Sequence, residues 1–349
     1  MPSMMSAREA WRHVVRKHLH IDDTPGNDVS WAPVVECASR DQLREIQNEK
    51  LVALVRFLYE ESAGYRRIFD EHGLEPGDIR TVDDLVKIPM TTRQDLAQDQ
   101  ARSAPWGELP PVTDELWRHD GWLFFSTSGT TGTPVAFRVT GFDREGFVQL
   151  YIRALYAGGI RTGHSAFNCF SYGPFSAFWG AHLALNRLGC PVIPGGGMDS
   201  RRRGSFIARF RPSIVIGTPT YLFHLAEIMR EEKLDASQVG AQFLVTAGEA
   251  GPCLAATRAR LRAAWGGAQI LDNYGCTEVA PAPLGYTCAV QSEREGEAVD
   301  LHLTEDMYIV EVVDPETGKA VPAGTRGVLV CTNLWSEGQA FLRYRIGDY

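Results

Sequence analysis

The chain has 349 residues, of which 44% are hydrophobic and 22% are charged, and its formal net charge is −8. This size and composition allow a sizeable core and predict about two domains, or one large α/β unit with an appendage. An acidic chain without a run of basic residues is a poor ligand for nucleic acid or for an anionic membrane. No stretch is long and apolar enough to span a bilayer, and the N-terminus lacks the apolar segment of a secretory signal.

The cysteines indicate a reducing compartment. They are odd in number, scattered and without a Cys-x-x-Cys pair, which is typical of free thiols rather than of a disulfide framework. They are Cys37, Cys169, Cys190, Cys253, Cys276, Cys288 and Cys331. We therefore expect a soluble cytoplasmic protein.

In chain order, residues 1–36 form a weakly patterned lead-in with a short helix over 7–18. From Asp41 onward, apolar residues recur every three or four positions, which predicts a long helix. A second helix over 65–71 ends at a His-Gly pair, a usual stop signal. The other signals in this part of the chain are helix N-caps at Thr81 and Thr92 and a proline-rich loop over 101–120.

Beyond residue 140, short β-like segments alternate with helices, which predicts parallel sheets covered by helices. We expect strands over 165–170, 191–194, 213–217, 243–246 and 269–274, and helices over 142–158, 177–188, 203–210, 220–232 and 255–265. From Val299 the pattern changes to antiparallel hairpins. Strands are expected there over 307–313 and 327–332, on either side of a turn at 314–318.

One stretch, residues 124–135 with the sequence FFSTSGTTGTPV, has the composition of an anion-binding loop. Glycines let the backbone turn tightly and aim its N–H groups inward, and the hydroxyl groups add donors without bulk. The loop residues are Thr127, Ser128, Gly129, Thr130, Thr131 and Gly132. A polyphosphate is the expected guest, but the loop of P-loop NTPases is excluded because no Gly-Lys-Ser/Thr follows the glycines.

Three separated motifs together resemble the adenylate-forming superfamily. The loop over 127–132 resembles its phosphate-binding motif, residues 274–278 (YGCTE) resemble its Tyr-Gly-x-Thr-Glu motif, and residues 344–348 (YRIGD) resemble its Tyr-Arg-Thr-Gly-Asp motif. Each motif alone is a weak signal, but three in this order are a strong one.

Within that superfamily the chain is most similar to the phenylacetate-CoA ligases, from about residue 40 to its end. The similarity is carried by residues 43–70, 89–92, 170–173, 188–194 and 211–213. The resemblance implies the large N-terminal domain of such an enzyme. It divides the chain into the lead-in, an α/β core over 37–298 that binds ATP and acid, and an antiparallel β subdomain over 299–349 that ends at a hinge.

The resemblance implies a two-step reaction with ATP, Mg²⁺ and coenzyme A. A carboxylate attacks the α-phosphorus of ATP, pyrophosphate leaves, and a thiol then displaces AMP from the acyl-adenylate. Thr277 would donate to the α-phosphate, Glu278 would bind Mg²⁺ through a carboxylate suited to a hard cation, and Asp348 would accept the ribose hydroxyls. The adenine would lie against the backbone of Gly248, Glu249 and Ala250 and be completed by Asn273 and Tyr274.

The resemblance also outlines a pocket for an aromatic acid, with aromatic walls and small residues at the base. Its members are Tyr172, Phe175, Phe178 and Trp179, together with Ala247, Gly275 and Pro281. The alternative reading is that Phe178 and Trp179 are core residues of a helix. The chain is about two residues shorter than the phenylacetate ligases between Tyr172 and Ala181, which bears on the contacts with the ring.

Two departures from the family pattern matter. The lysine that these ligases carry near Pro134 is missing, since Thr133 and Val135 flank the proline, so a phosphate contact is lost or made by another residue. The chain ends at Tyr349, without the small C-terminal domain that bears the family's reactive lysine. We therefore expect the chain to bind ATP and acid, to adenylate poorly and not to complete thioester formation.

Several alternatives stay open. The acid could be a benzoate, a hydroxybenzoate, an aminobenzoate or an arylacetate, and the acceptor could be a carrier-protein thiol instead of CoA. A non-catalytic nucleotide-binding module is the rival from another class, and a homodimer is not excluded. A structural zinc is a weak further option, because the ligand types lack the usual paired spacing. Its candidate ligands are Cys253, Cys276, Cys288, His302 and Cys331.

Overall fold

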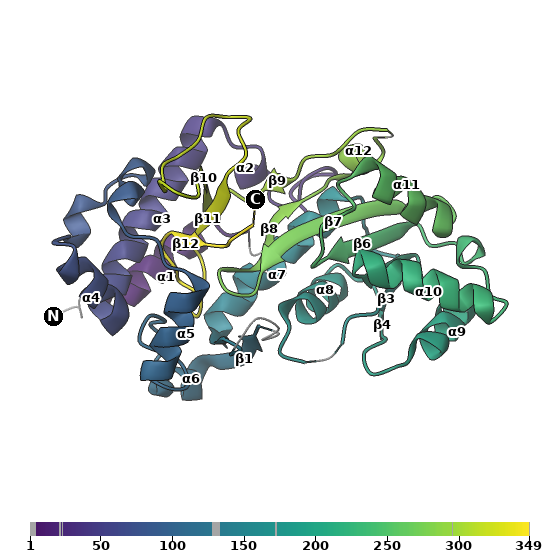
Figure 1. Ribbon diagram of the computed structural model, residues 1–349, viewed down its shortest axis with the longest axis horizontal. Coiled ribbons are helices and arrows are strands. Elements are labelled where there is room, and N and C mark those ends of the chain that lie inside the picture. The colour runs from purple at the N-terminus through teal and green to yellow at the C-terminus, as the bar shows by residue number, and fades with distance from the viewer. Residues whose placement is uncertain are drawn as a thin grey trace.

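The computed structural model describes residues 5–20, 22, 24–127, 133–171, 173–294 and 296–348. Its largest sheet contains β3 (Ala166–Asn168), β4 (Val192–Pro194), β5 (Ile214–Gly217), β6 (Phe243–Ala247), β7 (Gln269–Cys276), β8 (Ala280–Tyr286) and β9 (His302–Leu303). The strand order is β4-β3-β5-β6-β7-β8-β9 (Figure 1). Neighbours from β4 to β7 are parallel, whereas β8 and β9 are antiparallel additions. The predicted α/β class is confirmed.

Helices cover this sheet and build the other half of the molecule. The α-helices are α1 (Ala7–Lys17), α2 (Pro33–Glu36), α3 (Arg40–Glu61), α4 (Ala63–Glu71), α5 (Arg93–Arg102), α6 (Asp114–Asp120), α7 (Gly141–Ala157), α8 (Ser176–Arg187), α9 (Ser200–Phe210), α10 (Pro219–Glu231), α11 (Ala255–Ala264) and α12 (Ala289–Ser292). Short 3-10 helices are η1 (Pro76–Asp78), η2 (Val82–Lys87) and η3 (Ala236–Gln238). Within the described residues, no helix has the length and apolar character that crossing a bilayer requires.

Local chemistry explains most of these elements. Each buried parallel strand is a short apolar run, as in β5, whose residues are all buried. Helix starts carry hydroxyl caps: Thr92 Oγ1 accepts the Asp95 N–H at 3.3 Å, as predicted. The expected loop over 101–120 is partly wrong, because α6 begins after a cap at Thr113. β8 is an element that the sequence analysis missed.

Two smaller sheets complete the fold. β1 (Gly121–Ser126) pairs with β2 (Ala136–Thr140), so the two strands flank the Ser/Thr/Gly loop. β10 (Tyr308–Val313), β11 (Val328–Asn333) and β12 (Tyr344–Arg345) form an antiparallel sheet of three strands. The predicted hairpin is confirmed, and its turn is held by Asp314, whose carboxylate accepts two backbone N–H groups. β9 lies after residue 299 but joins the large sheet.

The lead-in is packed rather than appended. α1 lies against α3, and the buried Trp11 stacks on Phe57 with ring centroids 5.0 Å apart. Figure 1 shows α1, α3 and α4 on one side of the molecule, beside β10–β12, and the large sheet on the other side. The N-terminal helices and the β10–β12 sheet, far apart in sequence, therefore form one half together.

A buried charge cluster, made of Glu36, Lys50, Arg153 and Asp306, ties α2, α3 and α7 to the segment before β10. Arg153 contacts both Asp306 carboxylate oxygens, at 2.8 and 3.1 Å, and Glu36 at 3.2 Å. Lys50 is fully buried and donates to the Asp306 carbonyl oxygen at 2.7 Å. Burial alone would raise the pKa of Asp306, but Arg153 and Lys50 hold that pKa below its ordinary value.

Candidate active site

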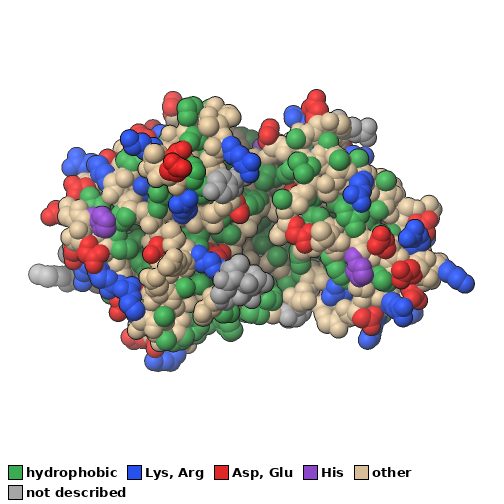
Figure 2. Space-filling view, in the orientation of Figure 1, with side chains coloured by type: hydrophobic (Ala, Val, Ile, Leu, Met, Phe, Trp, Pro, Cys, Tyr) green, Lys and Arg blue, Asp and Glu red, His purple; other side chains and the backbone are tan. Residues whose placement is uncertain are grey.

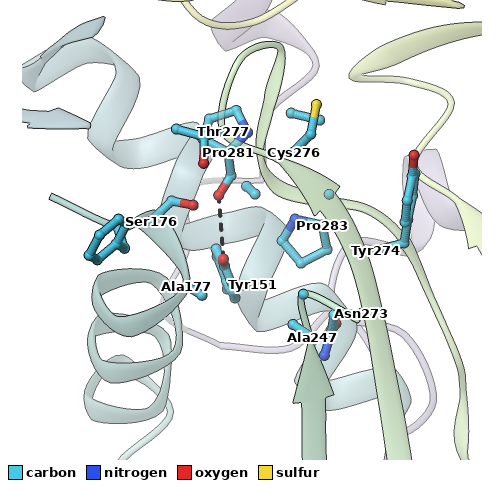
Figure 3. A pocket seen from close by; sticks show the side chains of 15 residues that line it. Tyr151, Ser176, Ala177, Ala247, Asn273, Tyr274, Cys276, Thr277, Pro281 and Pro283 are labelled. Carbon is cyan, nitrogen blue, oxygen red and sulfur yellow. Dashed lines mark hydrogen bonds between the residues drawn. The ribbon is translucent and has the colours of Figure 1, made fainter. Parts of the chain in front are cut away.

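The candidate site is a cavity where β6 and β7 end, which is where parallel sheets usually bind ligands. Its volume is about 180 Å³, and its walls come from β6, β7, β8, α7 and the start of α8. In space-filling form, hydrophobic side chains border a hollow between the two halves of the molecule (Figure 2). A close view shows the lining residues around the cavity (Figure 3).

The Tyr-Gly-x-Thr-Glu segment forms one wall, where the pairing of β7 with β8 becomes irregular. Gly275 fits there because a side chain would place Cβ 2.7 Å from the Ala280 carbonyl oxygen. Tyr274 donates its hydroxyl to the Asp348 carboxylate at 2.7 Å, so two of the sequence motifs meet. Burial and the Asp348 carboxylate raise the pKa of Tyr274, which keeps the hydroxyl protonated.

Arg93, the first residue of α5, links Glu278 to the Ser/Thr/Gly loop. Its guanidinium contacts Glu278 Oε1 at 2.9 Å and donates to Thr127 Oγ1 at 3.3 Å. Thr127 Oγ1 also accepts the Val135 N–H at 3.0 Å, which joins the two ends of the loop. Glu278 therefore lies close to Thr127, the first residue of that loop. Ser128, Gly129, Thr130, Thr131 and Gly132 lie outside the described residues.

The turn that carries Thr277 and Glu278 is held from behind by a buried segment. Gln339 Nε2 donates to the carbonyl oxygens of Thr277 and Glu278, the latter at 3.2 Å, and Asn333 Nδ2 donates to the Val279 carbonyl at 2.7 Å. The Glu278 side chain is 13% exposed. One partly exposed carboxylate suits Mg²⁺, which keeps several waters and takes its other oxygens from substrate phosphates.

The predicted adenine strip follows β6 directly. Gly248 lines the cavity with φ of +85°, a conformation that favours glycine. Glu249 turns away and caps α10, because its carboxylate accepts the Thr220 N–H at 3.0 Å and the Thr220 hydroxyl at 2.7 Å. Ala250 is exposed next to it, and Asn273 lines the cavity from β7. The strip therefore offers backbone to a ligand, with Glu249 held aside.

The residues predicted for the acid pocket divide into two groups. Ala247, Gly275, Pro281 and Phe175 line the cavity, and Phe175 is 43% exposed. Phe178 is fully buried in α8 and stacks on His182, and it is not among the described residues that line the cavity.

The other aromatic residues of that set lie elsewhere. Trp179 is partly buried, and its Nε1 donates to the Gly173 carbonyl oxygen at 2.9 Å. It is not among the described residues that line the cavity. Tyr172 lies outside the described residues.

Three functional candidates escaped the sequence analysis: Arg93, Tyr151 and Gln339. The only sequence signal for Arg93 is its position directly after residues 89–92, which resemble the phenylacetate-CoA ligases. Tyr151 lines the cavity from α7, and its hydroxyl donates to the Pro281 carbonyl oxygen at 3.3 Å (Figure 3). Nothing in the periodicity of that helix distinguishes this tyrosine from a core residue.

The thiols near the site are neutral. Burial, with Glu278 adding to it, raises the pKa of Cys276 to about 12. Burial and Asp272 raise the pKa of Cys253 to about 12. Across the part of the chain that the structure describes, no three His, Cys, Asp or Glu side chains gather to hold a metal ion. The structural zinc is therefore not supported.

Three observations define the class of protein: the mixed sheet, the cavity at its carboxyl edge, and the contacts that join the three sequence motifs. A family model described as AMP-binding enzyme matches residues 61–335, and the chain belongs to this family of adenylate-forming enzymes.

Its relatives narrow the branch to AMP-forming acid–thiol ligases. The chain is 33% identical over 318 residues to a phenylacetate-coenzyme A ligase of Thermus thermophilus, covering 91% of this chain and 67% of that protein. A second such ligase, from Aromatoleum evansii, is 31% identical over 90% of this chain and 67% of its own length. The chain thus spans about two thirds of these relatives.

A solved structure supports the same assignment. It is a 2-hydroxyisobutyryl-CoA ligase in complex with its acyl-AMP and CoA, in the thioesterification state. The superposition covers 93% of this chain and 68% of that one, with a TM-score of 0.83 and 26% identity.

Proposed function

We propose that the protein activates a small aromatic carboxylic acid with ATP and transfers the acyl group to coenzyme A. The observation that carries this proposal is the Arg93 bridge, which joins Glu278 to Thr127 at the start of the Ser/Thr/Gly loop, beside the cavity. A carboxylate, a guanidinium and a loop rich in hydroxyl groups are what a magnesium–triphosphate requires.

The proposed reaction has two steps. A carboxylate oxygen of the acid bonds to the α-phosphorus while the bond to the β-phosphate oxygen breaks and pyrophosphate leaves. The thiol sulfur then bonds to the acyl carbon, its proton is lost, and AMP departs with the oxygen. The chain's part in the first step is positioning and charge neutralisation.

The described residues suit specific positions around the nucleotide. Thr277 would donate to the α-phosphate and Glu278 would hold magnesium. Asp348, kept in place by Tyr274 at 2.7 Å, would accept the ribose hydroxyls. Asn273 and the backbone that follows β6 would enclose the adenine.

Arg93 is the candidate for the cationic contact that the missing lysine near Pro134 would make. It neutralises Glu278 through one contact at 2.9 Å, and its side chain is 34% exposed. When a triphosphate enters, the guanidinium can move to the phosphates and leave Glu278 to magnesium. A partly exposed pair with a single contact exchanges partners at little cost.

The cavity favours an aromatic ring as the acyl group. Its volume is about 180 Å³, and an engineered apolar cavity of about 150 Å³ in another protein binds benzene. Phe175, Pro281 and Pro283 supply flat apolar walls, and Ala177 and Ala247 leave room between them. A single ring with a short carboxylate arm fits this space better than a long chain.

Titration calorimetry with ATP and magnesium tests the nucleotide part of the proposal. We expect Arg93→Ala to weaken ATP binding roughly 10-fold to 100-fold, the value of a charge-assisted contact. Arg102→Ala is the matched control: it removes an arginine from the same helix that is 67% exposed and far from Glu278, and binding should not change. Unaltered ATP affinity in Arg93→Ala, or no ATP binding by the unmodified chain, contradicts the proposal.

The acceptor is tested with the chain extended to the full length of its relatives, by following thioester formation with radiolabelled benzoates and arylacetates. CoA and a carrier-protein thiol are supplied in parallel reactions. Thioester formed with CoA supports the proposal. If thioester forms only with the carrier protein, the carrier-protein thiol is the acceptor instead of CoA. If the acid that stimulates pyrophosphate release is aliphatic, the proposal of an aromatic substrate is wrong.

A further inference from the structure

The floor of the cavity carries a tyrosine whose position is fixed by the packing of two helices. The Tyr151 ring in α7 lies against Gly180 of α8, where a Cβ would come within 2.0 Å of the ring. Only a glycine leaves space there, so the ring is held with its hydroxyl toward the cavity (Figure 3). A side chain fixed in this way presents a defined polar group to any ligand.

The hydrogen-bonding capacity of this floor is one-sided. The Tyr151 hydroxyl donates to the Pro281 carbonyl oxygen at 3.3 Å, which uses its one donor. Burial raises the pKa of Tyr151, although a hydrogen bond with Ser176 opposes the rise, so the hydroxyl stays protonated. Ser176, which also lines the cavity, hydrogen-bonds to the tyrosine oxygen, so what remains at this point are one lone pair on that oxygen and one on the Pro281 carbonyl.

The backbone of β8 strengthens this bias. Residues 281 and 283 both line the cavity, and both are prolines, which have no N–H group to offer a ligand. The Pro283 carbonyl oxygen already accepts the Thr304 hydroxyl at 2.8 Å, so the Pro281 carbonyl is the acceptor that counts here. A polar substituent that reaches this floor therefore meets acceptors. A substituent that can only accept would face lone pairs and lose the hydrogen bonds it makes with water.

We propose that the acid bound in this cavity carries a hydrogen-bond donor on its ring, a hydroxyl or an amino group, and that Tyr151 and the Pro281 carbonyl recognise it. The inference rests on the proposed function, because it takes the cavity as the acid site. It adds a specificity-determining residue to that site and divides the benzoates into donor-bearing ligands and poor ones.

The test is the affinity of each acid, measured by titration calorimetry with a non-hydrolysable ATP analogue and magnesium present. The panel contains benzoate, its three hydroxy and three amino isomers, and the methoxy and fluoro counterparts. We expect at least one hydroxy or amino isomer to bind roughly fivefold to tenfold more tightly than benzoate, the value of one added hydrogen bond. The methoxy and fluoro counterparts should bind no better than benzoate.

Two variants make the test specific. Tyr151→Phe should remove the preference for the donor-bearing acid and leave the affinity for benzoate within about twofold. Tyr156→Phe is the matched control, because it removes a hydroxyl from the same helix that bonds to the Asn27 carbonyl at 2.9 Å, outside the cavity. It should keep the preference.

The outcomes separate the two proposals. If the unmodified protein binds no aryl acid, the proposed function fails. If it binds benzoate and its methoxy and hydroxy derivatives equally, or if Tyr151→Phe keeps the preference, the donor rule is wrong while the proposed function stands. A folded Tyr151→Phe protein, shown by an unfolding midpoint near that of Tyr156→Phe, is required for either reading.

Discussion

Two arginine–carboxylate pairs in this chain have opposite designs. In the buried charge cluster, Arg153 and Asp306 are 6% and 2% exposed and share two hydrogen bonds. At the site, Arg93 and Glu278 are 34% and 13% exposed and share one. The first pair also has Lys50 and Glu36 around it, whereas the second opens toward the cavity.

This difference separates structural charges from functional ones. A buried pair with several partners cannot release one of them without leaving an uncompensated charge in the core. A partly exposed pair with a single contact loses less when it separates, because water or an incoming ligand replaces the partner. We therefore expect changes in the first pair to unfold the protein and changes in the second to alter its chemistry.

The largest effect should follow from removing the centre of the buried charge cluster. Asp306→Ala leaves Arg153 and Lys50 with only Glu36 as counter-charge, which should lower the free energy of unfolding by about 3–5 kcal/mol. Denaturant unfolding followed by circular dichroism measures this loss. Asp83→Ala is the control, because its carboxylate belongs to an exposed pair and is 80% exposed. If both variants unfold alike, the cluster is not the structural element described above.

Glu278→Gln should show the reverse behaviour. It removes the charge proposed to hold magnesium, and we expect acid-dependent pyrophosphate release to fall by about 100-fold or more, as for other preorganised electrostatic groups. The unfolding free energy should change by no more than about 1 kcal/mol. Glu108→Gln, which breaks the ion pair with Arg67 away from the cavity, is the matched variant and should keep its activity. An unfolded Glu278→Gln protein would erase the distinction between the two pairs.

Lys50 sharpens the comparison through pH. Burial lowers its pKa to about 8, from an ordinary value near 10.5. Below pH 8 the lysine is charged in both states and the burial penalty is complete; between pH 8 and 10.5 only the folded protein releases the proton, so stability rises with pH. Relative to Lys50→Met, the unmodified protein should gain up to about 3 kcal/mol across that range. Parallel stability curves for the two proteins would mean that Lys50 does not titrate there.

The sequence predicted the parallel part of the large sheet, because the central strands β5 and β6 are short, mostly apolar runs that are almost wholly buried. The alternation from Ser165 to Tyr274 is confirmed element by element. The nearness of the motifs was also predictable in part: Tyr274 and Asp348 are bonded across 74 positions of sequence. Motifs that bind one ligand must meet in the fold, whatever their separation along the chain.

β8 was missed for a physical reason. Prolines cannot donate to a sheet ladder, so Pro281 and Pro283 argue against a central strand. The structure resolves the conflict at an irregular stretch. The β7–β8 register shifts there, and β9 pairs only with Gly285 and Tyr286. Strand propensity cannot show that a proline faces a cavity instead of a neighbouring strand. Here such prolines shape the floor of the proposed acid site.

Glu337 shows why buried charges escape sequence analysis. Its side chain is fully buried and is neutralised by Arg8, at 3.0 Å, and Arg12 from α1. Its backbone N–H donates to Asp143 at 2.6 Å. A carboxylate is expected at the surface unless its partners are known. Here the partners stand more than 320 positions earlier in the chain, where no local pattern can reveal them.

The same buried segment gives the smallest of the expected effects. Gln339 is fully buried and donates to the carbonyl oxygens of Thr277 and Glu278, so it fixes the turn that presents both side chains. Gln339→Leu leaves two carbonyls without a donor and lets the turn shift. We expect kcat for pyrophosphate release to fall about tenfold with little change in KM for the acid, because the turn acts on the phosphates.

Stability alone would not distinguish this positioning role from a packing role. Gln291→Leu is therefore the matched variant: it removes another buried glutamine, which accepts the Cys288 N–H at 3.1 Å at the start of α12. Both variants should unfold at lower denaturant, since each loses a buried hydrogen bond. Only Gln339→Leu should lower kcat, and an equal loss in both would assign Gln339 to packing. In that case the functional role would belong to Glu278 itself, and Gln339, which holds the turn from behind, would be a structural residue.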